Sequence, residues 1–258
     1  MTELIICSAT ALFASLLTLF SGFGLGTILT PVFALFFPIE IAVGLTGVVH
    51  LLNNLFKLSL LGKNADRNLV LKFGVPSMFG AFIGASLLIF LSSITFSISY
   101  NLFGLALITN PLKIVLGILI LFFVLMEIVP ALVKLQFSEK SIVAGGLISG
   151  FFGGLSGNQG ALRSAFLIKL NLEKKVYIAT GVVIACIVDL TRLPVYFKNL
   201  SDDIMQNNLT LLVSCTLCAF VGAYVGNKLI TKITIKTIQT IVSILLIIIA
   251  VSLAFGLI

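Results

Sequence analysis

Apolar stretches of about 20 residues recur along the whole chain, the length that an α-helix needs to cross about 30 Å of hydrocarbon. The pattern predicts eight hydrophobic segments, at 4–37, 41–62, 70–91, 111–130, 141–169, 175–197, 207–227 and 236–257. The alternating ten-residue segments of a transmembrane β-barrel are absent. The chain is therefore expected to be an all-α polytopic membrane protein with a single membrane domain, 1–258.

Two of these segments, 4–37 and 141–169, are interrupted by residues that a simple spanning helix avoids. The first contains LFSGFGLGTILTPVF with three glycines and a proline, and the second contains GGLSGNQG. A glycine inside a helix costs about 1 kcal/mol relative to alanine, and a proline costs about 3 kcal/mol. A straight helix over 4–37 would also be about 50 Å long, too long for one crossing. Each segment is expected to be a re-entrant pair of half-helices joined at the glycines.

The chain repeats itself, and two of its matches share an offset of 134 residues. The motif TGVV at 46–49 returns at 180–183, and the same offset places Gly26 on Gly160. GAFIG at 80–84 returns as GAYVG at 222–226. The order and spacing of these matches predict a duplication, with one repeat over about 1–137 and the other over about 138–258.

Loops rich in lysine and arginine in one half match poor loops in the other half. The rich loops contain Lys63, Arg67 and Lys72 in the first half, and Lys169, Lys174, Lys175, Lys228, Lys232 and Lys236 in the second. Lysine and arginine accumulate on the cytoplasmic side of membrane proteins. The two repeats are therefore expected to be inverted, as in secondary transporters. Lys113, on the expected external side, is an exception.

The residues that follow the two glycine breaks predict an anion site. New half-helices would begin after Gly26 and Gly160, and helix N-termini carry unpaired N–H groups and about half a positive charge. The expected ligands are Gly24, Gly26, Thr27, Ser156, Asn158, Gln159 and Gly160, with the hydroxyls of Thr46 and Thr180 and the charge of Arg163. The alternative is that the glycines only allow close helix packing, which is the role expected for Gly80, Gly84, Gly222 and Gly226.

Ionisable residues also lie inside the predicted spans, where unpaired charges are costly. His50 and Asp189 are candidates for carrying a coupling proton, since histidine exchanges protons near neutral pH. The alternatives are a buried structural histidine and a structural ion pair between Asp189 and Arg192. Lys57 either faces the site or extends to the cytoplasmic surface. Glu127 and Glu139 are expected to be solvated.

Composition narrows the function classes. The chain is 59% hydrophobic and 10% charged, with a mean hydropathy of +1.23. No catalytic constellation, metal cluster, cofactor motif or ATPase motif is recognised, so neither an enzyme nor a cofactor or metal site is predicted. The net charge of +7 carries no information about nucleic-acid binding in a membrane protein, and no nucleic-acid partner is predicted. No lysine or arginine precedes Lys57, so no cleaved signal peptide is expected. The four cysteines are expected to be small buried residues.

The glycine-rich stretch SGFGLGTILTPVF followed by IEIAVGLTGVV, with its second copy SGFFGGLSGNQGALRSAF followed by VYIATGVV, resembles the sulfite exporter TauE/SafE family. The resemblance covers nearly the whole chain. It implies a multi-pass permease of the cell (inner) membrane for a small anion such as sulfite, an organosulfonate or an organic acid, moved outward. Its expected partners are that anion and membrane lipids, and the driving force is an ion gradient or the anion's own gradient.

Three other functions remain open from the sequence. An anion channel would use the same site. A thiol- or sulfur-handling membrane protein would use Cys186, Cys215 or Cys218 for chemistry, and a structural subunit would carry no ligand. The sequence also leaves open whether the protein forms a homo-oligomer.

Overall fold

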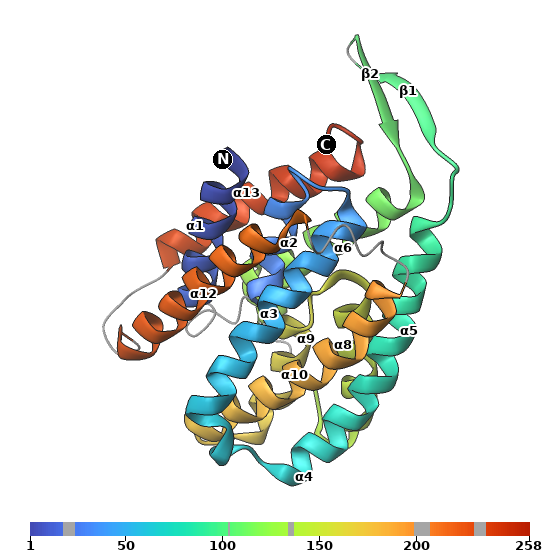
Figure 1. The fold of residues 1–258 in the computed structure, drawn as a ribbon. Coiled ribbons are helices and arrows are strands. Elements are labelled where there is room, and N and C mark those ends of the chain that lie inside the picture. Colours follow the sequence, from blue (N-terminus) through green and yellow to red (C-terminus); the bar gives the residue numbers. More distant parts are fainter. Residues whose placement is uncertain (18–23, 103, 134–136, 199–206, 230–235) are drawn as a thin grey trace.

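The computed structural model describes residues 1–17, 24–102, 104–133, 137–198, 207–229 and 236–258 (Figure 1). Five helices in these residues are long and apolar enough to cross a membrane, namely Ile39–Ser59, Arg67–Ser92, Pro111–Ile128, Lys174–Phe197 and Leu209–Gly226. Two shorter apolar helices cover Thr2–Leu17 and Val242–Ala254. The prediction of a polytopic helical membrane protein is confirmed.

The helices follow the predicted segments closely. The first half contains α1 (Thr2–Leu17), α2 (Leu25–Phe33), α3 (Ile39–Leu61), α4 (Arg67–Leu69), a π-helical turn (Val70–Gly74), α5 (Val75–Ser92), α6 (Pro111–Ile128) and α7 (Pro130–Val133). The second half contains α8 (Ile142–Ser156), α9 (Gly160–Leu167), α10 (Lys174–Phe197), α12 (Leu209–Leu229) and α13 (Lys236–Ala254). Short 3-10 turns cover Gly62–Asn64, Glu139–Ser141 and Ile168–Leu170.

At each of the two predicted breaks, the structure has two separate helices instead of one continuous helix. The chain leaves α8 through Gly157, whose φ of +80° and ψ of −3° lie in the left-handed region, where glycine is the usual residue after a helix end. In the first half, α1 ends at Leu17 and α2 begins at Leu25 after an extended Gly24. Part of that glycine-rich stretch, including Ser21 and Gly22, lies outside the described residues.

A β-hairpin corrects the all-α expectation. Strands β1 (Ile98–Leu102) and β2 (Leu105–Thr109) pair antiparallel, with Leu102 opposite Leu105. Short runs of aliphatic and aromatic residues favour strands, and Gly104 in the turn has a φ of +82°. The hairpin extends beyond the helices at the end of the molecule where both termini lie, whereas α4 lies at the opposite end (Figure 1).

Helix α3 packs antiparallel against α10, and α6 packs antiparallel against α13. Along α3 and α10, Gly47 lies beside Arg192, His50 bonds Asp189, and the Asp66 N–H after α3 bonds Thr180. Along α6 and α13, Gly117 lies beside Ala250 and Ala254. The Lys113 ammonium donates to the carbonyl of Ile258 at 2.9 Å. Lys113, the exception to the predicted distribution of basic residues, thus has a hydrogen-bond partner.

Helices α5 and α8 pack in parallel with their backbones in contact. A β-carbon added to Gly80 or Gly84 would collide with carbonyls of α8, and one added to Gly150 or Gly154 would collide with carbonyls of α5. Gly222 of α12 lies in the same way against the Leu12 carbonyl of α1. The close-packing role predicted for Gly80, Gly84 and Gly222 is confirmed. Large apolar side chains elsewhere on the helices, such as Phe82, Leu217 and Ile248, are exposed, as expected for helices surrounded by lipid.

Candidate functional site

The two broken segments contact each other at their breaks. A β-carbon added to Gly26, at the start of α2, would lie 2.7 Å from the carbonyl oxygen of Gly157 in the α8–α9 turn. The same β-carbon would lie 3.9 Å from the Thr46 methyl group on α3. The start of α2, the turn before α9 and the middle of α3 therefore meet at one place, which we call the tip junction.

Both half-helices begin there without a side-chain cap. The N-cap residues are Gly24 for α2 and Gln159 for α9, and neither side chain hydrogen-bonds the first turn. The first N–H groups of a helix have no partner within the helix, and Gly26, Thr27 and Gly160 are buried. The Thr27 N–H bonds back, donating to the Gly24 carbonyl at 3.0 Å. The two N-termini thus present amide donors in a buried place.

Asn158 and Gln159 add unsatisfied side chains to the turn between α8 and α9. Each is 2% exposed, and both amide atoms of each side chain lack a hydrogen-bond partner within the described residues. Such groups are rare in folded proteins and call for an explanation. Ser156 differs, because its hydroxyl donates to the Phe152 carbonyl at 3.0 Å.

Three further threonines, Thr30, Thr46 and Thr180, differ in whether their hydroxyls are hydrogen-bonded. The hydroxyls of Thr30 and Thr46 are buried without a hydrogen-bond partner in the part of the chain that the structure describes. Thr46 lies beside Gly26, and Thr30 lies beside Gly157. The Thr180 hydroxyl instead accepts the Asp66 N–H at 2.9 Å, so Thr180 contacts the connection that follows α3.

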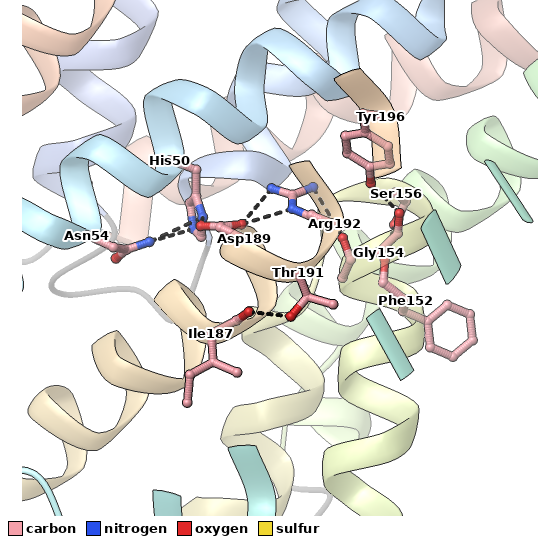
Figure 2. A network of polar contacts seen from close by, with 11 residues as sticks. His50, Asn54, Phe152, Gly154, Ser156, Ile187, Asp189, Thr191, Arg192 and Tyr196 are labelled. Atoms are coloured by element: carbon pink, nitrogen blue, oxygen red, sulfur yellow. Dashed lines mark hydrogen bonds and ion pairs between the residues drawn. The ribbon is translucent and has the colours of Figure 1, made fainter. Parts of the chain in front are cut away.

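Figure 2 shows a chain of polar contacts that joins α3 to α10. The His50 Nδ1 donates to the Asp189 carboxylate at 2.6 Å. With Nδ1 used in this way, Nε2 accepts the Asn54 amide at 3.2 Å. The sequence singled out His50 and Asp189 separately, and the structure makes them one buried pair.

Arg192 continues this chain from Asp189 to the backbone of α8 (Figure 2), and it lies beside Gly157 of the tip junction. Its Nε donates to Asp189 at 2.9 Å, and its Nη1 donates to the Gly153 carbonyl of α8 at 3.2 Å. Nη2 approaches the same Asp189 oxygen at 2.9 Å, but without the alignment of a hydrogen bond. The predicted Asp189–Arg192 ion pair is confirmed. The place of Arg192 at the tip junction was missed, because spacing along one helix does not reveal contacts with another.

Lys57 is a further buried cation, and Arg163 is a half-buried one. The Arg163 Nε lies 3.4 Å from the β-position of Gly181 on α10, and its Nη1 is buried without a hydrogen bond among the described residues. Arg163 interacts electrostatically with Asp189 and with Lys57. Lys57 is 6% exposed, and its ammonium lies 3.2 Å from the Asn53 amide in the orientation that satisfies both groups. Lys57 therefore does not extend to the surface.

These groups give the interior an excess of positive charge. Arg192 contacts the Asp189 carboxylate at 2.9 Å. Arg163 interacts electrostatically with Asp189, and Lys57 with Arg163. Charges interact more strongly in a buried environment than in water. The arrangement therefore favours the entry of a small anion.

Glu127, near the end of α6, corrects a prediction. The sequence indicated a solvated carboxylate, but both carboxyl oxygens of Glu127 are buried and lack a hydrogen-bond partner within the described residues. Its neighbours Phe123 and Met126 belong to an apolar cluster with Leu162 of α9. Glu139 is exposed as expected.

The substitution Glu127→Gln is accordingly expected to leave thermal stability unchanged or to raise it, since no ion pair is lost and a buried carboxylate is costly. Thermal unfolding in detergent, followed by intrinsic tyrosine fluorescence, measures the effect. Glu139→Gln is the matched surface control. A loss of several degrees in Tm for Glu127→Gln alone would show that the carboxyl has a stabilising partner.

The cysteines are free thiols. Cys7, Cys186 and Cys215 are buried, and the Cys215 sulfur lies 3.8 Å from the Ser8 hydroxyl, where α12 packs on α1. Cys215 and Cys218 are not joined by a disulfide. Within the described residues, no three His, Cys, Asp or Glu side chains are grouped closely enough to hold a metal ion.

Comparison with known proteins identifies the family. The family model described as sulfite exporter TauE/SafE matches residues 7–253. Neither the curated proteins nor the solved structures contain a match. Since the match covers almost the whole chain, this protein belongs to the sulfite exporter TauE/SafE family of multi-pass cell-membrane transporters, which are not enzymes.

Proposed function

We propose that this protein exports a small sulfur oxyanion, sulfite or an organosulfonate, and binds it at the tip junction during alternating access. The observation that carries the proposal is the contact between Gly26, at the uncapped start of α2, and Gly157, in the turn that leads to the uncapped start of α9. Buried helix N-termini bind anions through their N–H groups and their partial positive charge. The family supplies the general substrate class, sulfur-containing compounds.

Each predicted site residue has a place in this proposal. Gly24, Gly26 and Gly160 let the anion approach backbone amides, and Thr27, Thr46, Asn158 and Gln159 supply side-chain donors. Ser156 and Thr180 contribute less, because their hydroxyls already bond Phe152 and Asp66. Arg163 provides charge one turn after the start of α9. Its unpartnered Nη1 supports that role.

Alternating access would come from two inverted repeats rocking against each other. Helices α3 and α10 carry the duplicated TGVV motif and pack antiparallel. A two-fold axis that exchanges two antiparallel helices is perpendicular to both of them. For helices that span the membrane, such an axis therefore lies in the membrane plane. The α6–α13 pair obeys the same rule. The two remaining large contacts, α1 with α12 and α8 with α5, would be exchanged by the same axis.

His50 and Asp189 are the candidates for proton coupling. Their 2.6 Å contact joins α3 to α10, one helix from each proposed repeat. A proton gained or lost by this pair would change the charge that holds the two helices together. The pair therefore has a place from which it could link protonation to the rocking motion.

Transport of ³⁵S-labelled sulfite by proteoliposomes tests the proposal. The wild type is expected to give saturable flux, and Arg163→Ala is expected to lower kcat/KM at least tenfold, the loss of about 1.4 kcal/mol of binding. Lys169→Ala, which removes an exposed cation near the end of the same segment, is the control. Flux that rises with voltage and never saturates would indicate a channel instead. Equal flux for Arg163→Ala and wild type would remove Arg163 from the site.

A further inference from the structure

We propose that Thr30, Thr46 and Arg192 directly contact the oxyanion, with Asp189 as the residue that positions Arg192. This inference rests on the proposed function and deepens it, since Thr30 and Arg192 lie outside the site that the sequence predicted. The ligand class is an anion whose head group presents three oxygens, as in sulfite or a sulfonate.

Gly157 provides the first argument. A β-carbon added there would lie 3.2 Å from the Arg192 Nη1 and 3.6 Å from the Thr30 hydroxyl. A guanidinium and a hydroxyl therefore flank one point next to a glycine. Because the φ of Gly157 is +80°, residues with side chains rarely adopt its backbone conformation. The turn keeps this point free of a side chain.

The two threonines provide the second argument. Thr30 is 1% exposed and Thr46 is 0% exposed, and neither hydroxyl has a hydrogen-bond partner in the described part of the chain. A threonine inside a helix commonly bonds a carbonyl of the preceding turn. Thr191, next to Arg192, does so, donating to the Ile187 carbonyl at 2.8 Å. A ligand at the tip junction could hydrogen-bond the hydroxyls of Thr30 and Thr46, which lie beside Gly157 and Gly26.

Arg192 provides the third argument. Its Nε and Nη1 are committed to Asp189 and Gly153, whereas Nη2 makes no aligned hydrogen bond. The Asp189 contacts fix the planar guanidinium between Gly47 and Gly157, whose β-positions lie 3.3 Å from Nη2 and 3.2 Å from Nη1. A guanidinium held in this way can donate to an oxyanion in a fixed direction.

Substitution of the threonines separates binding from folding. We expect Thr30→Val and Thr46→Val each to raise the half-saturation concentration for sulfite at least fivefold in proteoliposomes. Their thermal stability should be equal to or above that of the wild type, since valine removes a buried hydroxyl that had no partner. Thr30→Ser, which keeps the hydroxyl, should retain most of the affinity.

Thr191→Val is the matched control, because it removes a hydroxyl from α10 that is already bonded. It should leave the half-saturation concentration unchanged and should not raise stability. Arg192→Lys, which keeps the charge but loses the planar group, should reduce sulfite affinity more than Thr191→Val does.

The outcomes are distinguishable. Unchanged sulfite affinity in Thr30→Val, Thr46→Val and Arg192→Lys, with saturable wild-type flux, would overturn this inference and leave the proposed function standing. Lower thermal stability of both valine variants would also overturn it, since it would assign the hydroxyls a structural role. If the wild-type protein in proteoliposomes transported no sulfur oxyanion, both proposals would be overturned.

Discussion

Gly150→Val is expected to prevent the protein from folding in the membrane. A β-carbon at this position would overlap the Ser77 carbonyl and lie 2.6 Å from the Ser77 carbonyl carbon. The obstacle is backbone of α5, which cannot rotate away as a side chain can. The cost should therefore exceed the roughly 1–3 kcal/mol of ordinary overpacking in a core. The yield of monodisperse protein after detergent extraction measures the effect.

Ala144→Val is the control for this experiment. Ala144 lies on the same helix but is exposed, so valine adds methyl groups on the lipid side. Its yield should match the wild type. If Gly150→Val assembled as well as Ala144→Val, α5 and α8 would not be in backbone contact, and the observed position of the α8–α9 turn would lose its support.

Asp189→Asn is expected to destabilise the protein by about 3–5 kcal/mol, the range seen when one partner of a buried ion pair is removed. The asparagine would leave Arg192 and His50 buried without their carboxylate, and Arg192 is 0% exposed. Thermal unfolding of the purified protein measures the loss. Sulfite flux should fall with it, because the guanidinium is no longer held at the tip junction.

A second variant tests the cause of that loss. Combining Asp189→Asn with Arg192→Met removes both charges and should recover much of the stability, since no guanidinium is then left buried without its carboxylate. Flux should not recover. A double variant as unstable as Asp189→Asn alone would show that the damage does not come from the unpaired guanidinium.

The sequence predicted the helices well because each spanning segment carries its own signal. Length and hydropathy located them, and the glycines of GGLSGNQG marked the break that Gly157 makes. The hairpin at 98–109 gave no comparable signal. Its strands have five residues each and lie between two long apolar segments, so length and hydropathy did not distinguish them. The helix predicted over 111–130 ends at Ile128, because Val129 precedes Pro130 and adopts an extended conformation with ψ of 117°.

The sequence predicted only those parts of the site whose residues lie close together along the chain. Helix breaks and the polar residues beside them lie close together in sequence, so the glycines, Asn158 and Gln159 were identified. The His50–Asp189 contact joins residues 139 positions apart, and no local spacing reveals it. Thr30 was not singled out, and Glu127 was expected to be solvated, because the surroundings of both are set by the packing of other helices.

The most direct test of the central claim is to locate a bound oxyanion. Selenite has the shape and charge of sulfite, and its selenium scatters X-rays anomalously. In crystals of the wild type grown with selenite, the account predicts one strong selenium peak at the tip junction, between the starts of α2 and α9 and in contact with Arg192. A peak at any other place, with none at the tip junction, would contradict it.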